Sequence, residues 1–467
     1  DKNVAVGYQS LKSNTTADHN TAFGDQALES NTTGTRMTSV GSRSGMQNTT
    51  GNYNAFFGYD AGESNTTGAS NTFIGDSAGR ETTTASNNTA VGQAALLANT
   101  TGTGNSALGA DALNDCTTGD YNVAIGYQSQ RLTTTADNNT GLGAYTLYDN
   151  TTGASNTAVG FSALANNTTA SNNVAVGQNA LLANTTGTNN TACGMQSLKA
   201  NTTASNNTAV GLNALVTNTT GASNVAVGAS ALDANTTGAQ NVAVGDGSLG
   251  LNTTAINNVA VGKNALSANT TGNSNIAVGK SALFGNTTGA SNTAVGLNAL
   301  QANTGGIQNI GIGDSAGFYT TGSGNITIGA RNNGGSFVPA FGITGHSNYI
   351  SMGTSSVTNA YIKVAWTVTS DARDKSNFAE VPHGLSFVNQ LAPYSYEFKL
   401  DREEAETDGI VRYGFKAQDI LALEGSNPVI IDNEDPDSLR YREAALIPVL
   451  VKAIQELTAR LETLEGE

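Results

Sequence analysis

One pattern of apolar and small residues recurs along the first two thirds of the chain. A glycine that follows an apolar residue returns every 17 residues from Gly7 to Gly313, and a last copy, one residue shorter, ends at Gly329. The unit reads N-x-A-V-G-x-x-A-L-x-x-N-T-T-G-x-x, and only Ala, Ser or Thr stands three positions after this repeat glycine. Leucine stands four positions after it in most copies. The exceptions are Gly45, Gly62, Gly79, Gln130 and Gly317.

So short a period predicts one coil of a parallel β-solenoid rather than a helical repeat. Two clusters of β-forming or apolar residues are separated by Gly and Asn-Thr-Thr turns, as in coils that stack on their neighbours. Stacking places like residues above one another, so we expect hydrogen-bonded ladders of Asn and Thr. With about 4.8 Å between strands, the twenty copies would form a rod of roughly 95 Å.

Apolar residues are adjacent in each repeat, with Ala158 beside Val159 and Ala163 beside Leu164. Neighbours in a strand point to opposite faces, so both faces of the strand are expected to be apolar. A solenoid buries only its inner face. We therefore expect the small Ala/Ser face to lie outside and to pack against two further copies of the chain, which predicts a homotrimer.

The N-T-A-V-G stretch of residues 156–160 resembles the N-S-V-A-I-G coils of trimeric autotransporter adhesin heads. The resemblance covers residues 1–329, although the units of those heads are usually shorter. It implies a left-handed parallel β-roll within a homotrimer.

Composition divides the chain near residue 330. All six prolines lie beyond it, and residues 370–467 hold 20 acidic and 10 basic side chains, so they carry −10 of the net charge of −15. We expect a repeat rod at 1–329, a β-rich junction or tip at 330–369, and a small α+β domain at 370–467. An acidic chain without a basic stripe argues against nucleic acid as a partner.

Other classes of function find little support in the sequence. Cys116 stands where most repeats have Asn and Cys193 where most have Val, which favours structural roles over a disulfide framework. No apolar run reaches the roughly 18 residues that a membrane span needs. No pair of carboxylates recurs at fixed positions, so a glycosidase site in the rod is not expected, and neither is a cofactor or metal site. The chain begins at Asp1, two residues before a repeat, so we expect a preceding part.

Three aromatic residues stand out in the junction: Tyr349, Tyr361 and Trp366. They could contact a receptor or close the last coil. We favour closure of the coil, because so few aromatic side chains are more often a hydrophobic plug.

Four motifs follow in order in the last 98 residues. They are Ser370-Asp-Ala-Arg-Asp-Lys375-Ser-Asn377, Leu391-Ala-Pro-Tyr-Ser-Tyr396, Tyr413-Gly-Phe-Lys-Ala-Gln-Asp419 and Leu446-Ile-Pro-Val-Leu-Val-Lys-Ala-Ile-Gln-Glu-Leu457. Together they resemble the S74 peptidase family, the intramolecular chaperone domain of phage tail fibres and tailspikes, and in particular marine and cyanophage fibres.

The resemblance implies that this domain trimerises, guides folding of the β-stalk before it, and then cuts itself off. It implies Ser370 as the nucleophile, Lys375 as its base, and cleavage between Thr369 and Ser370. A serine hydroxyl needs a nearby base, and a lysine can act as one when burial lowers its pKa. Ala372 and Asp374 stand where the family has Glu and Leu, which bears on the efficiency of cleavage. At most, then, the chain is a peptidase that acts on itself.

The chain is expected to end in a coiled-coil helix. Leu446, Leu450, Leu457, Leu461 and Leu464 follow a spacing close to a heptad seam. Pro448 is expected in the first turn of this helix, where proline is tolerated.

These features predict a viral, cyanophage-like tail fibre that attaches to a host surface. Its expected partners are two further copies of itself, upstream tail proteins of the virion, and a host receptor that is a glycan or a protein. It would lie on the virion, outside the cell. The alternatives are a bacterial cell-surface trimeric adhesin, which should end in a membrane β-barrel, and a polysaccharide-degrading tailspike, which should carry a groove of acidic residues.

Overall fold

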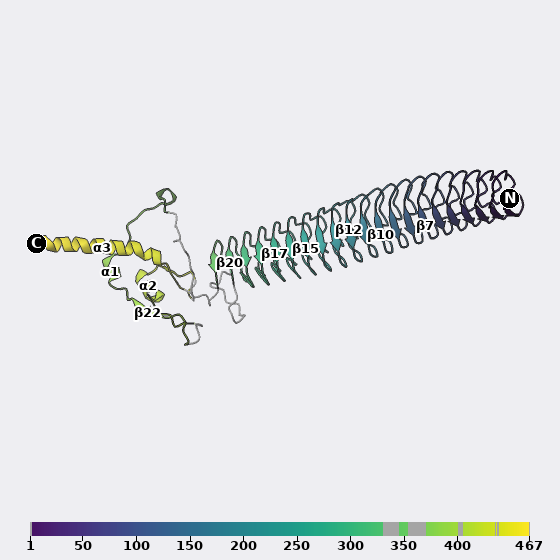
Figure 1. Cartoon of the computed structure of the whole chain (residues 1–467). Coiled ribbons are helices and arrows are strands. Elements are labelled where there is room, and N and C mark those ends of the chain that lie inside the picture. The colour runs from purple at the N-terminus through teal and green to yellow at the C-terminus, as the bar shows by residue number, and fades with distance from the viewer. Residues whose placement is uncertain are drawn as a thin grey trace. The chain divides into compact units, whose positions relative to one another are not determined.

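The computed structural model describes residues 2–329, 345–353, 370–399, 405–434, 436 and 439–466. The chain divides into two compact units, Asp1–Thr354 and Ser355–Glu467, each with its own hydrophobic core. Figure 1 shows the first as a stack of coils and the second as a small domain that includes a long helix. No described helix has the length and apolar character needed to cross a bilayer.

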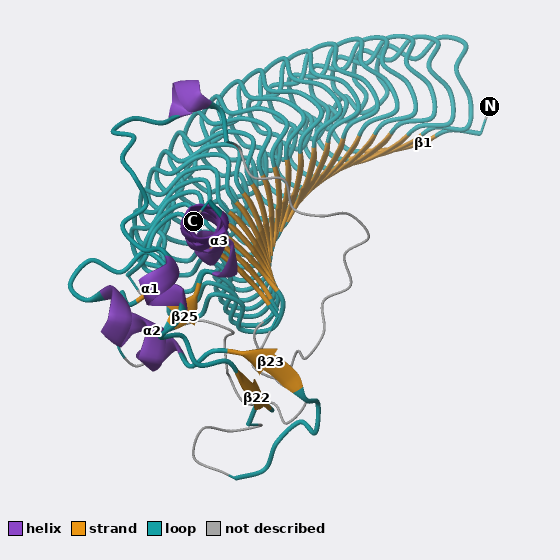
Figure 2. Cartoon of the chain, turned by 90° about the vertical axis from the view of Figure 1, so that its left-hand side faces the viewer, coloured by secondary structure: helices purple, strands orange, loops and turns teal. Residues whose placement is uncertain are grey.

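The first unit is a roll built on one parallel sheet of 21 strands, each three residues long. Each strand pairs with the next at equivalent positions, as Ala158 does with Ala175, and Figure 2 shows them as one continuous row. The strands are β1 (Val4–Val6), β2 (Thr21–Phe23), β3 (Thr38–Val40), β4 (Ala55–Phe57), β5 (Thr72–Ile74), β6 (Thr89–Val91), β7 (Ser106–Leu108), β8 (Val123–Ile125), β9 (Thr140–Leu142), β10 (Thr157–Val159), β11 (Val174–Val176), β12 (Thr191–Cys193), β13 (Thr208–Val210), β14 (Val225–Val227), β15 (Val242–Val244), β16 (Val259–Val261), β17 (Ile276–Val278), β18 (Thr293–Val295), β19 (Ile310–Ile312), β20 (Ile326–Ile328) and β21 (Ile350–Met352).

Turns form the wall opposite the strands, and backbone hydrogen bonds join this wall from coil to coil. Leu164 N donates to Ala180 O at 3.0 Å, and Thr168 N donates to Thr185 O at 3.1 Å. The sequence prediction of a parallel β-solenoid with 17-residue coils is therefore confirmed.

The stack continues beyond the last repeat glycine. Strand β21 pairs in parallel with β20, with Ile350 opposite Ile326 and Met352 opposite Ile328. Residues 330–344, which lie between these strands in sequence, are outside the described part of the chain. The repeats therefore end at Gly329, while the sheet gains one further strand.

The interior of each coil is small. The middle residue of the strand and the leucine four after the repeat glycine point inward, and Ala158 and Leu164 are both fully buried. The flanking Val159 is only half-buried. The expectation that the Ala/Ser face lies outside is therefore wrong: alanine faces inward because leucine from the opposite wall fills the space, and the larger β-branched residues face out.

The leucine exceptions in the third to fifth coils show how tightly this interior is filled. Phe56 and Phe73 replace the inward alanine of β4 and β5, and their rings stack at 5.4 Å. A Cβ on Gly62 would lie 2.7 Å from the Phe56 ring, and one on Gly79 would lie 2.5 Å from the Phe73 ring. Phenylalanine on one wall thus requires glycine on the other.

Two buried ladders of asparagine run through the roll, as expected. In one, Asn156 N donates to Asn139 Oδ1 at 2.9 Å, and Asn156 Nδ2 donates to Ala170 O at 2.9 Å. In the other, Asn184 Nδ2 donates to Asn167 Oδ1 at 3.0 Å. Each side chain satisfies turn groups that would otherwise be buried without a partner, because a short coil has few other donors.

The second unit holds a small domain with two antiparallel strand pairs. Its core consists of Phe387, Ile420, Ile430, Ile431, Leu446 and Val449. Its elements are the 3-10 helix η1 (Ala372–Asp374), α1 (Leu385–Val388), β22 (Tyr394–Tyr396), β23 (Arg412–Gly414), α2 (Ala417–Glu424), β24 (Ile431–Asp432), β25 (Arg440–Tyr441) and α3 (Glu443–Glu465).

Helix α3 differs from its prediction in two respects. It begins at Glu443, so Pro448 lies inside the helix in its second turn rather than in its first. Leu446 is buried in the domain core, whereas Leu450, Leu457, Leu461 and Leu464 are exposed. Leu446 therefore belongs to the core of the single chain. A coiled-coil seam formed by the other four leucines stays a prediction.

Candidate functional site

Ser370 and Lys375 flank a single helical turn. The turn is η1, and the side chain of Asp371 caps it by accepting a hydrogen bond from Arg373 N at 2.9 Å. Across this turn, Lys375 Nζ donates to Ser370 Oγ at 2.6 Å. The structure therefore brings together the two residues that the S74 resemblance implies as nucleophile and base.

The same turn holds an exposed ion pair. Arg373 Nη2 lies 2.6 Å from Asp371 Oδ2. The hydrogen bond from the Arg373 side chain, with a smaller one from its backbone N–H, lowers the pKa of Asp371, and the same pairing raises the pKa of Arg373. Because exposed pairs contribute little stability, the pair orients the turn more than it holds the domain together.

The side chains of Ser370 and Lys375 both lie at the surface. A lysine acts as a general base only after losing its proton, and removal of water from around the ammonium favours that loss. Cleavage by this pair therefore requires a cover over the turn that the described residues of the single chain do not supply. In the described part of the chain, no three His, Cys, Asp or Glu residues group as metal ligands would.

Two side chains of α3 hold the segment that follows this turn. Lys452 Nζ donates to Val381 O at 2.6 Å, and Glu456 Oε2 accepts from Leu385 N at 2.8 Å. Glu456 thereby caps α1, whose own N-cap residue, Gly384, has no side chain. The path from Ser370 to the domain core is thus fastened to the terminal helix.

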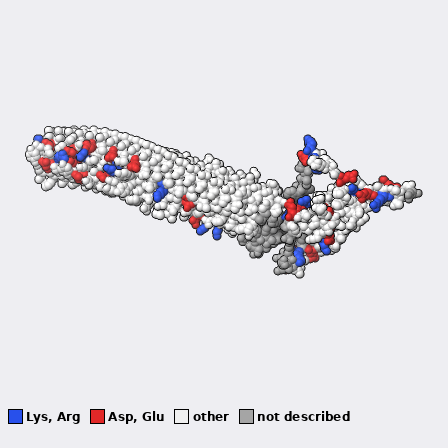
Figure 3. Space-filling model, turned by 180° about the vertical axis from the view of Figure 1, so that it is seen from behind, with Lys and Arg blue, Asp and Glu red and all other residues white. Residues whose placement is uncertain are grey.

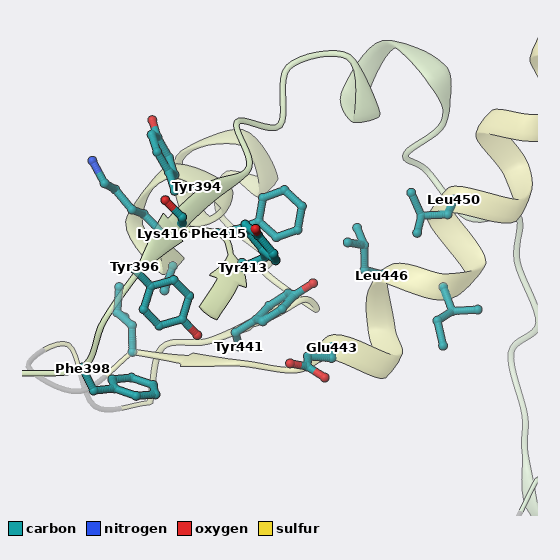
Figure 4. Close-up of a pocket in the computed structure, with 15 residues that line it drawn as sticks. Tyr394, Tyr396, Phe398, Tyr413, Phe415, Lys416, Tyr441, Glu443, Leu446 and Leu450 are labelled. Atoms are coloured by element: carbon teal, nitrogen blue, oxygen red, sulfur yellow. The ribbon is translucent and has the colours of Figure 1, made fainter. Parts of the chain in front are cut away.

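An aromatic pocket of about 750 Å³ opens between β22, β23, β25 and the start of α3 (Figure 4). Tyr394, Tyr396 and Phe398 line it from one strand segment, and Phe415 and Tyr441 line it from others. Lys416 Nζ lies 4.6 Å from the centre of the Tyr394 ring, an attractive cation–π distance. Burial, with a smaller contribution from the charge of Glu443, raises the pKa of Tyr441.

Glu443 is the one carboxylate among the described residues that line this pocket. The other lining residues are mostly aromatic and aliphatic, which suits the pocket to binding an apolar group. The sequence analysis did not identify it. The alternation of Tyr394, Tyr396 and Phe398 was the available signal, because residues two apart share one face of a strand.

Of the three aromatic residues in the junction, Tyr349 lies within the described part of the chain. Tyr349 N donates to Asn325 Oδ1 at 3.0 Å, and the Tyr349 ring packs edge-on against His346 at 5.2 Å. This half-buried tyrosine continues the contacts of the last coils. Tyr361 and Trp366 lie outside the described residues, so closure of the coil by all three stays a prediction.

Comparison with known proteins finds a family match for part of the C-terminal unit. Residues 370–425 match the Peptidase_S74 family, described as chaperone of endosialidase. The match includes Ser370 and Lys375 and extends through α2. No curated protein and no solved structure matches the chain. The predicted resemblance to the S74 family is thus confirmed, and an S74 chaperone domain together with a parallel β-solenoid fits a tail-fibre-like or tailspike-like protein.

Proposed function

From an S74 chaperone domain that follows a parallel β-solenoid, we propose that the chain is a trimeric phage tail fibre, of the cyanophage type, that attaches the virion to a host surface. The observation that carries this proposal is the order of the two parts. A stack of 21 strands with equivalent pairing is followed along the chain by residues that match a chaperone family. Upstream tail proteins and a glycan or protein receptor are its further partners.

The repeat creates a folding problem that a chaperone domain could solve. Identical coils on different copies can pair one coil out of register with little loss of contact, so a long repetitive assembly has many near-native traps. A domain that joins the copies at one end would set the register before the coils stack. The exposed leucines of α3 provide an apolar surface for that joining.

Self-cleavage would then release the finished fibre. The Ser370 hydroxyl attacks the carbonyl carbon of Thr369, Lys375 takes the hydroxyl proton, and the bond from that carbon to Ser370 N breaks as the nitrogen gains a proton. Water hydrolyses the resulting ester and restores the serine. Because the turn is exposed in one chain, assembly of three copies would supply the cover that the lysine requires.

The attachment role can be tested with the purified protein and its phage. Preincubation of host cells with the folded fibre should lower phage adsorption in a dose-dependent way, and antibodies to the roll should label tails in electron micrographs. Heat-denatured fibre is the control. Absence of label from the virion would exclude the tail-fibre assignment, whereas label without competition would limit the chain to a structural part of the tail.

A further inference from the structure

The outer face of the strand row carries an apolar residue at the third position of every strand, and Val, Ile, Ala, Thr or Ser at the first position. In each strand the first and third residues point away from the coil interior. The third residue is exposed in many coils, from 36% for Val176 to 56% for Phe23. Others of this kind are Val6, Phe57, Ile74, Leu108, Leu142, Val210, Val261, Val278, Val295, Ile312, Ile328 and Met352. Contiguous exposed apolar surface of this extent is uncommon on a monomeric protein.

This face also lacks charge. None of the outward residues of strands β1 to β21 is Asp, Glu, Lys or Arg. The neighbouring position, directly after the repeat glycine, carries charge in several coils, including Asp25, Asp76, Lys263 and Lys280. Charged side chains also gather over the N-terminal coils in the view of Figure 3. Charge is therefore tolerated on the coil but absent from the outer strand face, as expected of a surface that becomes buried.

The area is large enough for a stable association. Three residues at about 3.3 Å each and 21 strands at about 4.8 Å give a face of about 1,000 Å² per copy. A standard stable interface buries about 800 Å² per partner. The face would thus support association along the full length of the roll.

We propose that this outer strand face is the surface through which copies of the chain pack against one another. The inference rests on the proposed trimeric fibre and replaces the predicted Ala/Ser interface. A second copy is the occupant that fits, because its strands carry the same apolar rows at the same spacing and can meet every coil in turn. In a trimer, the three strand rows would face a common axis and form a core of Val, Ile and Thr.

Cys193 provides a native probe of this face. It is the outward third residue of β12, it is exposed in the single chain, and it pairs in register with Val210 of β13. Burial of the face would shield its thiol. Cys116 lies inside the roll, where burial raises its pKa to about 12, and peptide mapping separates the two cysteines.

The experiment measures the rate at which iodoacetamide labels Cys193 in the native full-length protein and in the urea-unfolded chain, alongside the native mass. The expected result is an oligomer in which Cys193 is labelled at least about tenfold more slowly than in the unfolded chain, since labelling then requires local opening. Val210→Glu should restore fast labelling. Leu212→Glu is the matched control, because Leu212 is also apolar and exposed (45%, against 37% for Val210) but follows the repeat glycine.

The outcomes separate the two proposals. An oligomer in which Cys193 is labelled at the unfolded rate overturns the strand-face interface and leaves the trimeric fibre standing. A monomeric mass overturns both. Equal labelling of the Val210→Glu and Leu212→Glu proteins would also overturn the interface. The measurement on the native protein is decisive even if the Val210→Glu chain does not fold.

Discussion

Phenylalanine and leucine fill the same interior from opposite walls of the coil. Most coils combine an inward alanine on the strand with a leucine on the turn wall, whereas the coils of Phe56 and Phe73 reverse this arrangement with Gly62 and Gly79. The reversal conserves volume, since a side chain is added on one wall where it is removed from the other. The breaks in the leucine pattern are thus a second solution to the same packing problem.

Phe56→Ala should leave a cavity and lower the free energy of unfolding by about 3–5 kcal/mol. Adding Gly62→Leu should recover most of this loss, because the pair then matches the common Ala and Leu arrangement. Urea unfolding followed by circular dichroism measures both changes. The single Gly62→Leu variant is the control and should be destabilised, since its side chain would meet the Phe56 ring. No recovery in the double variant would contradict the volume argument.

Cys116 interrupts a ladder of buried amides. It occupies the position of an asparagine, with only a long contact of 3.7 Å from Sγ to Gly119 O. Among the residues that the structure describes, Asn99 Oδ1 one coil before it and Thr133 Oγ1 one coil after it are buried without a hydrogen-bond partner. Unpaired buried polar atoms are costly.

Cys116→Asn should therefore stabilise the roll by about 1 kcal/mol, because an amide at this site can donate to Asn99 and accept from Thr133. The melting temperature measures the gain. Cys116→Ser is the matched control, since its hydroxyl is too short to bridge the two coils and should give no such gain. A Cys116→Asn protein that melts at or below the native temperature would refute this reading of the ladder.

Ser370→Ala should leave the chain at full length on a denaturing gel, while the native protein yields two fragments. Lys375→Arg should also stay uncut, because a guanidinium keeps the charge but does not give up its proton. Ser386→Ala, in the nearby helix α1, is the control and should be cut normally. An uncut native protein would remove the proteolytic part of the proposed function and leave the chaperone part untouched.

At the scale of elements, the sequence predicted the coil but not which face of each strand points into its interior. The 17-residue period, the strand positions and the asparagine ladders follow from the repeat alone. The inward face did not, because Ala158 and Val159 are both apolar and alternation does not say which one faces in. The space inside the coil decides which residue faces in. That space depends on the side chains of the opposite wall, which the strand pattern alone does not reveal. Pro448 was expected in the first turn of the terminal helix because proline is tolerated there, but α3 begins earlier, at Glu443, so Pro448 lies inside the helix.

Glu456 joins two elements of the C-terminal domain that are distant in sequence. Glu456→Ala should remove the cap on α1 at a cost of about 1 kcal/mol, as for other helix caps. Hydrogen exchange at residues 385–388 should then be about fivefold faster, if local opening controls it. Glu462→Ala on the exposed part of the same helix is the control. Unchanged exchange in the Glu456→Ala protein would show that α1 is held by packing of Phe387 alone.

At the scale of the whole molecule, the proposed chaperone role predicts that the C-terminal domain is needed only while the roll forms. Expression of residues 1–369 alone should give aggregated protein, because copies that start to stack without a fixed end can trap wrong registers. Fibre that was first assembled and then cut should remain soluble and trimeric. The fraction of soluble protein after centrifugation measures the difference. Soluble trimers from residues 1–369 would show that the roll finds its register unaided.

The repeat glycines stack closely from coil to coil, so neighbouring coils follow the same backbone path. A Cβ on Gly228 would lie 2.5 Å from Gly245 O, and comparable contacts recur at other repeat glycines, so the coils share one backbone path. Cutting the chain at any two points 17 residues apart and rejoining it would connect matching positions on that path. Unequal recombination between repeats in the gene could therefore shorten or lengthen the roll by whole coils, in steps of about 4.8 Å each.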